Sequence, residues 1–267
     1  MPTHPTLSLL HLYATEMNLY GDRGNVLALL RHCQWRGITL HLHTAGRHAT
    51  PADMANHHLY MWGGGQDAQQ LAIMADLHTH KADPIKQAHA QGATFLGICG
   101  GYQLLGHGYT PHEGQRLQGL GMLDVDTVAG HNRHIGNVVA TPTAEALAAL
   151  SQADLPQPAP LVGFENHSGV TTLGALATPL ARTQHGAGNN GQDGFEGACQ
   201  GRVLGTYLHG PLLPKNPWLT DALLGMAWAY ATGSSVEDEA NPFRQPLPQA
   251  EPWAKLAHQQ ASLIAGA

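Results

Sequence analysis

Hydrophobic positions in the first hundred residues predict strands and helices in alternation. Short apolar runs bounded by Gly or polar residues are typical of buried strands, and apolar residues repeated every three or four positions are typical of helices. The runs predict strands over residues 7–13, 38–43, 58–62 and 94–98. The repeats predict helices over residues 26–33, 66–77 and 84–91. This alternation predicts an α/β fold with a doubly wound, mostly parallel sheet flanked by helices.

A different pattern begins near Gly119, where turn residues separate short apolar runs as in antiparallel sheets. Added strands are expected over residues 122–129, 136–141, 161–164, 170–173, 176–183 and 202–207. Helices are expected over residues 143–150, 216–232 and 251–264, and the Gly-, Asn- and Gln-rich segment 185–201 predicts a mobile loop. Because no linker interrupts the chain, we expect a single domain over residues 1–267, with a core at about 7–232 and a C-terminal extension at 233–267.

The composition argues against several classes of protein. The chain has 267 residues, of which 43% are hydrophobic and 12% charged, and its formal net charge of −6 disfavours a nucleic-acid-binding surface. No apolar run has the length of a membrane span, and residues 1–5 lack the features of a signal peptide. The three cysteines have no paired spacing, so we expect no disulfide framework. A chain without disulfides fits the reducing cytoplasm, which is the location we expect.

The 19 histidines raise the question of a metal site. Pairs at 41 and 43, 78 and 80, and 131 and 134 could each supply two ligands, but none matches a zinc signature. We therefore expect no metal in this chain and place most of the histidines on the surface.

The segment Gly97-Ile-Cys-Gly-Gly101 is the strongest candidate for chemistry. It follows a predicted strand and precedes a predicted helix, which is the arrangement of the nucleophile elbow of hydrolases, here with Cys99 as the nucleophile. A tight turn of this kind requires small neighbours, and the N–H groups of the following helix favour the reactive thiolate. The alternative is a buried Cys in a Gly-rich turn.

Two further features accompany this turn. The Gly63–Gly65 triplet ends another predicted strand, where backbone N–H groups can approach a ligand, although a flexible turn explains it equally well. A Cys nucleophile needs a base, and His209 stands at the end of an apolar run before Gly-Pro. Cys33 falls on the apolar face of a helix and is expected in the core, and Cys199 is given no role.

Several motifs resemble one known family. G-I-C-G-G-Y-Q at 97–103 and G-T-Y-L-H-G-P at 205–211 are similar to class I glutamine amidotransferases of the cobyric-acid-synthase-like branch. Within that branch, the closest resemblance is to the glutaminase subunits of lipid II isoglutaminyl synthases. The motifs that carry it are N-L-Y-G-D-R-G-N at 18–25, G-G-G-Q-D at 63–67, G-F-E-N-H-S-G at 163–169 and L-H-G-P-L-L-P-K-N at 208–216.

The resemblance implies roles for particular residues. Cys99 would attack the side-chain amide of glutamine and form a thioester, and His209 would act as its base. Arg133 would bind the glutamine substrate, as suits a guanidinium facing a carboxylate. Gly64 and Gly100 would supply the backbone N–H groups of an oxyanion hole.

The third catalytic group stays open. Many class I glutaminases carry Glu two residues after the catalytic His, where this chain has Pro211. Asp22 and Glu165 are the candidates, and a dyad without a third member is the alternative. Asp22 is explained equally well as a helix cap.

The resemblance also implies a partner. A Mur-ligase-like (MurT-type) subunit would form a heterodimer with this chain, bind ATP and Mg²⁺, amidate the D-glutamate of lipid II with the ammonia, and alone contact lipid II. In agreement, the chain lacks a P-loop motif, and we expect no cofactor in it. The alternatives are a glutaminase for a different, corrinoid-type synthase, a catalytically quiet regulatory subunit, and a Cys hydrolase of esters or peptides.

Overall fold

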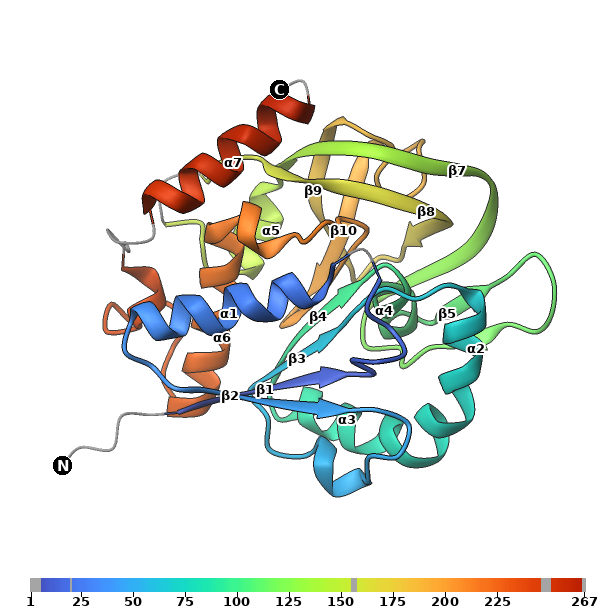
Figure 1. The fold of residues 1–267 in the computed structure, drawn as a ribbon, viewed down its shortest axis with the longest axis horizontal. Helices are drawn as coiled ribbons and strands as arrows, with labels where there is room; N and C mark the ends of the chain where they lie inside the picture. Colours follow the sequence, from blue (N-terminus) through green and yellow to red (C-terminus); the bar gives the residue numbers. More distant parts are fainter. Residues whose placement is uncertain (1–5, 20, 155–157, 246–250, 266–267) are drawn as a thin grey trace.

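Eleven strands of the described residues form one mixed sheet in the order β2-β1-β3-β4-β11-β10-β9-β7-β5-β6, with β8 paired to β7 (Figure 1). The structure is a computed structural model and describes residues 6–19, 21–154, 158–245 and 251–265. Residues 1–5 and Tyr20, which belongs to the motif at residues 18–25, therefore lie outside the described residues.

The strands and helices have the following bounds. The strands are β1 (Leu7–Leu12), β2 (Leu40–Ala45), β3 (Leu59–Trp62), β4 (Thr94–Ile98), β5 (Gly108–Thr110), β6 (Leu117–Gln118), β7 (Val125–Pro142), β8 (Leu161–Leu173), β9 (Thr178–His185), β10 (Phe195–Gln200) and β11 (Val203–Thr206). The α-helices are α1 (Arg23–Trp35), α2 (Asp67–Asp76), α3 (Ala82–Ala90), α4 (Gly100–Leu105), α5 (Ala144–Ala149), α6 (Pro217–Thr232) and α7 (Glu251–Ala265), and a π-helical turn over Leu77–Lys81 joins α2 to α3.

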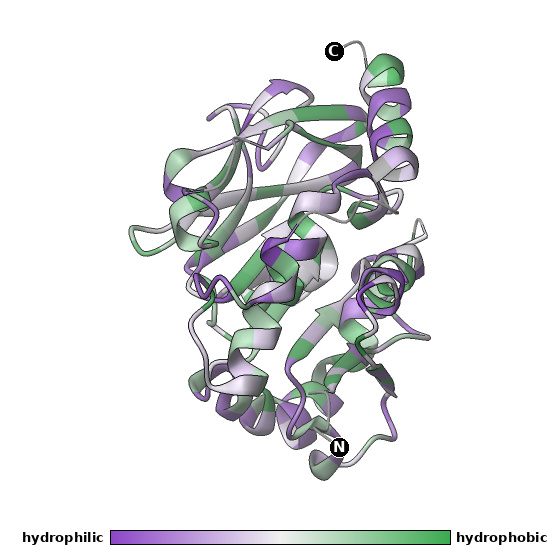
Figure 2. Cartoon of the chain, turned by 90° about the vertical axis from the view of Figure 1, so that its left-hand side faces the viewer, coloured by the Kyte–Doolittle hydropathy of each residue, from purple (hydrophilic) through white to green (hydrophobic). Residues whose placement is uncertain are grey.

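The strands β2, β1, β3, β4 and β11 run parallel. All but β2 are buried on both faces, whereas the four middle residues of β2 are exposed. Successive side chains of a strand point to opposite faces, so an apolar run supplies two cores. Leu7 and Leu9 join the core that contains residues of α1 and α6, and Leu10 and Leu12 join the core with α2 and α3. In Figure 2 the hydrophobic residues gather in these strands and in the helix faces against them. The four predicted strands and the α/β class are confirmed, and the single domain stays a prediction.

The antiparallel part differs from the sequence prediction in strand length. Residues 122–129 and 136–141 were expected as two strands, but β7 runs unbroken from Val125 to Pro142, and β8 likewise joins the two strands expected over 161–164 and 170–173. The pairing of β7 with β8 shifts register between Ala129 and His134. The polar and Gly residues that suggested a turn instead form this irregularity within a continuous two-stranded ribbon.

The expected mobile loop over residues 185–201 is wrong in its second half. Strand β10 lies there, antiparallel between β9 and β11 in the middle of the sheet. Gly197 has φ +64°, and a Cβ on it would lie 2.7 Å from the backbone O of Gly205 on β11. This glycine therefore allows two strands to approach closely and does not mark a mobile segment. The composition of residues 185–201 alone does not distinguish these two uses of glycine.

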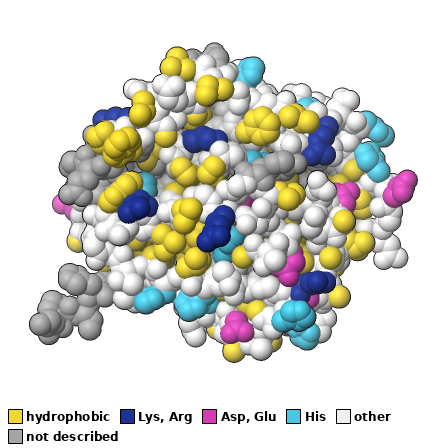
Figure 3. Space-filling view, in the orientation of Figure 1, with side chains coloured by type: hydrophobic (Ala, Val, Ile, Leu, Met, Phe, Trp, Pro, Cys, Tyr) yellow, Lys and Arg dark blue, Asp and Glu magenta, His cyan; other side chains and the backbone are white. Residues whose placement is uncertain are grey.

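The last helix, α7, lies across the ribbon end of the molecule (Figure 1). Its exposed apolar side chains are Trp253, Leu256, Leu263 and Ile264. Figure 3 shows apolar side chains on this part of the surface, with Lys and Arg dispersed over the drawn face.

Glu196 on β10 holds the segment that follows β11. Its carboxylate is fully buried and accepts hydrogen bonds from the hydroxyl of Thr206 and from the N–H of Tyr207, the latter at 2.9 Å. The N–H of Leu208 in turn donates to the Thr206 hydroxyl at 3.0 Å. Burial outweighs these hydrogen bonds and raises the pKa of Glu196 to about 7.

We expect the substitution Glu196→Ala to lower the free energy of unfolding by about 2 to 4 kcal/mol, because it leaves two buried donors without their acceptor. Urea denaturation measures this loss. The substitution Glu196→Gln keeps an acceptor oxygen and should cost less.

The pH dependence distinguishes charge from packing at Glu196. A carboxyl whose pKa is higher in the folded than in the unfolded state stabilises least when ionised, so the parent protein should lose stability as the pH rises from 4.5 to about 7. Glu196→Gln should lose less over the same interval. Equal pH profiles for the two proteins would contradict the raised pKa.

Candidate active site

Cys99 occupies a strained turn between β4 and α4. Its φ of +50° and ψ of −105° lie outside the regions that L-residues ordinarily adopt. Glycine is required on both sides: a Cβ on Gly97 would lie 2.8 Å from the backbone C of Gly101, and one on Gly101 would lie 2.3 Å from the backbone O of Trp62. The predicted strand, turn and helix are therefore present, and Cys99 is half-buried rather than enclosed in the core.

The pairing of β11 with β4 brings His209 to the same edge of the sheet. The two strands are parallel, with Thr206 opposite Ile98, and the N–H of Cys99 donates to the carbonyl of Thr206 at 2.8 Å. The chain continues to His209, whose N–H donates to the carbonyl of Phe164 on β8 at 2.8 Å. Parallel strand ends thus meet where α/β sheets bind ligands.

Gly64, at the carboxyl end of β3, shows how closely the predicted groups approach one another. A Cβ built on it would lie 2.8 Å from Cε1 of His209, 3.3 Å from Oδ2 of Asp22 and 3.5 Å from Cβ of Cys99. Side chains from separate parts of the sequence therefore converge on one glycine.

Asp22 lies beside His209, as one of the open candidates predicts. Its Oδ1 is 3.4 Å from Nδ1 of His209, and both side chains are fully buried. Asp22 precedes α1 but makes no side-chain capping hydrogen bond, so the helix-cap interpretation is wrong. Glu165, the other candidate, lies elsewhere: it accepts the N–H groups of Ala187 and Gly188 at 2.8 and 3.0 Å.

The oxyanion role expected for Gly64 needs a correction. Its N–H donates to Oδ2 of Asp22 at 2.6 Å, so this amide holds the carboxylate in place instead of facing a ligand. The next residue, Gly65, lines the cavity with Cys99. Its backbone N would lie 3.0 Å from a Cβ built on Gly100, so the Gly65 and Gly100 backbones are in close approach.

The surroundings of His209 favour its imidazolium form. Burial lowers its pKa, but hydrogen bonds with Asp22 and with Cys99 outweigh burial and raise the pKa to about 10. A positive imidazole next to Cys99 is the environment in which a thiolate forms. By contrast, burial raises the pKa values of Cys33 and Cys199 to about 12, which makes both thiols unreactive.

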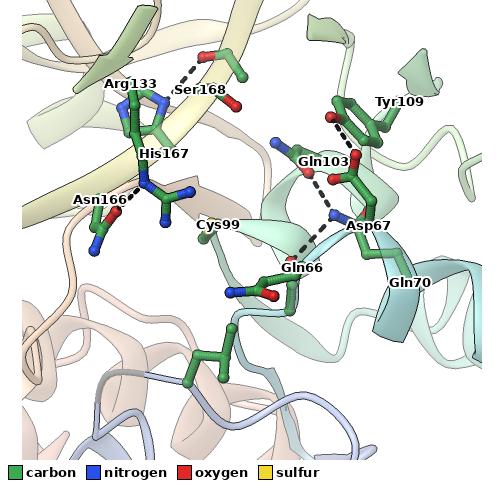
Figure 4. Close-up of a pocket in the computed structure, with 13 residues that line it drawn as sticks. Gln66, Asp67, Gln70, Cys99, Gln103, Tyr109, Arg133, Asn166, His167 and Ser168 are labelled. Carbon is green, nitrogen blue, oxygen red and sulfur yellow. Dashed lines mark hydrogen bonds between the residues drawn. The ribbon is translucent and has the colours of Figure 1, made fainter. Parts of the chain in front are cut away.

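A cavity of about 320 Å³ opens above Cys99. Figure 4 shows its two walls on either side of the sulfur. One wall carries Arg133, whose Nε donates to Oδ1 of Asn166 at 2.8 Å. Arg133 lies within the register shift between β7 and β8, where a bulge can redirect a side chain.

The second wall contains residues to which the sequence analysis gave no role. Nε2 of Gln70 donates to Oε1 of Gln103 at 2.9 Å, and Nε2 of Gln103 donates to the Tyr207 hydroxyl at 3.1 Å. Tyr207 also stacks on the ring of His167, which lies on the Arg133 side of the cavity (Figure 4), with centroids 3.7 Å apart. Gln103 lies four residues after Cys99, and this helical spacing is the signal that could have identified it.

The described residues contain no group of three or more His, Cys, Asp or Glu side chains arranged to hold a metal ion. The described helices are also too short or too polar for any of them to cross a lipid bilayer.

Comparison with known proteins places this site in a family. A family model for the CobB/CobQ-like glutamine amidotransferase domain matches residues 8–217. The chain belongs to this family. The resemblance drawn from the sequence motifs is thereby confirmed.

Two relatives are similar to this chain over most of its length. Both are named lipid II isoglutaminyl synthase (glutamine-hydrolyzing) subunit GatD. The relative from Staphylococcus aureus is 36% identical over 225 residues, which are 83% of this chain and 84% of the relative. The relative from Streptococcus pneumoniae is 33% identical over 232 residues, which are 86% of this chain and 84% of the relative. The cobyric acid synthase of Sphingopyxis alaskensis is 35% identical over 173 residues, but these are only 31% of its length.

Solved structures agree on the fold of the family. A putative GMP synthase protein from Thermoplasma acidophilum superposes with a TM-score of 0.57 at 14% identity, covering 86% of this chain and 97% of the other. A second structure, described as a glutamine amidotransferase, gives a TM-score of 0.53 at 16% identity, covering 84% and 98%.

We expect Gly64→Ala to slow alkylation of Cys99 by iodoacetamide at pH 7 at least about tenfold, because the added methyl group displaces His209 or Asp22. Mass spectrometry of the cysteine peptides measures the rate. Gly136→Ala is the matched control, since a Cβ there meets no atom within 4 Å and its φ is not positive. Equal alkylation in the two variants would contradict the packing around Gly64.

A second prediction tests which of the two candidate carboxylates, Asp22 or Glu165, interacts with His209. Asp22→Asn keeps an acceptor for the Gly64 N–H but removes the charge, so the pKa of His209 should fall by about 1 to 3. NMR titration of isotopically labelled histidine measures it. Glu165→Gln serves as the control and should leave the His209 titration in place; a larger change from Glu165→Gln than from Asp22→Asn would reverse the assignment.

Proposed function

We propose that this protein hydrolyses L-glutamine to glutamate and ammonia through a thioester on Cys99. The observation that carries the proposal is the convergence of Cys99, His209 and Asp22 beneath a cavity whose wall holds Arg133. A nucleophile, a base and an orienting carboxylate form the arrangement of acyl-transfer catalysis, and the guanidinium suits the substrate carboxylate.

The first half-reaction forms the thioester. The Cys99 thiolate attacks the carbon of the side-chain amide, and the carbonyl oxygen becomes an oxyanion bound by the N–H groups of Gly100 and Gly65. Gly65 replaces Gly64 in this role, because the Gly64 amide binds Asp22. The imidazolium of His209 then gives its proton to the nitrogen, the C–N bond breaks, and ammonia leaves.

The second half-reaction releases glutamate. His209, now neutral, takes a proton from a water molecule as that water attacks the thioester carbon. A second oxyanion forms and collapses, the C–S bond breaks, and the thiolate and imidazolium are restored. Asp22 keeps the imidazole in one orientation throughout, which makes it a positioning group.

The ammonia is delivered, we propose, to a Mur-ligase-like (MurT-type) partner that binds ATP and Mg²⁺ and amidates the D-glutamate of lipid II in the cytoplasm. This is supported by the relatives named as subunits of lipid II isoglutaminyl synthase, which match over 84% of their length. A corrinoid-type synthase is the second candidate. It is less well supported, because this chain matches only 23% to 31% of the length of the cobyric acid synthases compared.

A diazo-ketone analogue of glutamine tests the reaction. We expect one adduct, on Cys99, with Cys33 and Cys199 unmodified, because both of these are buried and carry raised pKa values. Peptide mass spectrometry locates the adduct, with and without the synthase partner. Absence of an adduct under both conditions would favour a catalytically quiet subunit.

The Arg133→Ala variant tests the substrate class. Loss of the guanidinium should slow labelling by the glutamine analogue about tenfold or more, while simple alkylation of Cys99 by iodoacetamide continues. Arg116→Ala is the control, since Arg116 pairs with Asp126 at the surface and does not line the cavity. Unchanged labelling in Arg133→Ala would favour a hydrolase of esters or peptides.

A further inference from the structure

The proposed substrate has two charges that the site must accommodate. Glutamine carries an α-carboxylate and an α-ammonium group on the same carbon, at the opposite end from its amide. If the amide lies at Cys99 and the carboxylate at Arg133, the ammonium group faces the remaining wall of the cavity. Taking an ammonium group out of water is costly unless an anionic or strongly polar acceptor replaces its hydration.

Among the described residues that line the cavity, Asp67 is the one with a carboxylate. It lies across the cavity from Arg133, with Cys99 between the two walls (Figure 4). The cavity thus has a cation on one side and an anion on the other, which is the complement of an α-amino acid zwitterion.

Asp67 is an exposed residue whose carboxylate is oriented by a hydrogen bond. It is the first residue of α2, and its carboxylate accepts a hydrogen bond from the Tyr109 hydroxyl at 3.2 Å. Burial and the Asp67 charge raise the pKa of Tyr109, so the phenol keeps its proton and remains a donor. An ionised carboxylate accepts up to about four hydrogen bonds, so this contact leaves it able to bind an ammonium group.

The neighbouring amides are less accessible to an ammonium group in their present arrangement, because Oε1 of Gln70, which has no hydrogen-bond partner, is buried. Gln70 uses its Nε2 to bind Gln103 and the backbone O of Gly65, and Gln103 binds Gln70 and Tyr207. Both side chains are almost fully buried. They connect the first turn of α2 to the helix that follows Cys99, which holds Asp67 at a set place relative to the sulfur.

We propose that Asp67 binds the α-ammonium group of the amino-acid substrate and so makes the site specific for free glutamine over amides that lack an α-amino group. This inference rests on the proposed function, since it requires glutamine in the cavity. Asp67 would have no part in the bond-breaking steps.

A structural role for Asp67 is the alternative that the test must separate. An acidic residue in the first turn stabilises a helix through its dipole, whatever the cavity binds. Asp83 provides a matched control, because it lies in the first turn of α3, is exposed, and does not line the cavity.

The experiment measures binding in a Cys99→Ala background, so that no turnover is needed. Calorimetry compares L-glutamine with glutaramate, which is glutamine without its α-amino group, in the presence of the synthase partner. Asp67→Asn keeps an acceptor for Tyr109 and should weaken L-glutamine binding about 10- to 100-fold, the usual range for a hydrogen bond to a charged group. Its glutaramate affinity should change less than about twofold, and Asp83→Asn should alter neither ligand.

Each other outcome is decisive. Unchanged glutamine binding in Asp67→Asn, or an equal loss for both ligands, would overturn the role of Asp67. Equal affinities of the unsubstituted background for the two ligands would overturn recognition of the ammonium group. Failure of that background to bind L-glutamine at all would instead refute the proposed function, and the inference with it.

Discussion

The parallel pairing of β4 with β11 is the constraint on which the rest of the site depends. It places the carbonyl of Thr206 against the N–H of Cys99, and the chain beyond Thr206 then delivers His209. Four neighbouring strands each contribute at the same edge of the sheet: β1 leads to Asp22, β3 to the glycine triplet, β4 to Cys99 and β11 to His209. The order of the strands in the sheet, rather than any single loop, therefore brings the residues of the site together.

The structure maintains two unfavourable features at this edge. Cys99 has a backbone conformation that costs of the order of 1 to 3 kcal/mol, and the polar side chains of Asp22 and His209 have no solvent exposure. Close packing of the neighbouring glycines maintains the backbone conformation of Cys99. The hydrogen bond from the Gly64 N–H and the Asp22–His209 contact offset the cost of burying these two side chains. Such features persist only where the surroundings over-determine them, and here the packing leaves no room for a side chain at Gly64, where a Cβ would meet His209, Asp22 and Cys99.

Much of this was accessible from the sequence because it is local. The first four strands, the turn at Cys99 and the core position of Cys33 follow from apolar runs and glycine spacing. The errors concern features that depend on distant partners. Continuous β7 looked like two strands because its pairing irregularity is polar, and β10 looked like a loop because Gly197 serves contact with another strand. Asp22 was a candidate, but its contact with a histidine 187 positions away is decided only by the folded sheet.

The two walls of the cavity come from different parts of the architecture. The nucleophile and Asp67 belong to the parallel half, whereas Arg133 belongs to the long β7–β8 ribbon, whose pairing is interrupted where the arginine lies. The guanidinium proposed to bind the substrate carboxylate and the thiol of Cys99 therefore lie on different parts of the sheet. Because His209 pairs with Phe164 of β8, a change in the bend of the ribbon would act on Arg133 and on the imidazole together, so ligand affinity and turnover are coupled.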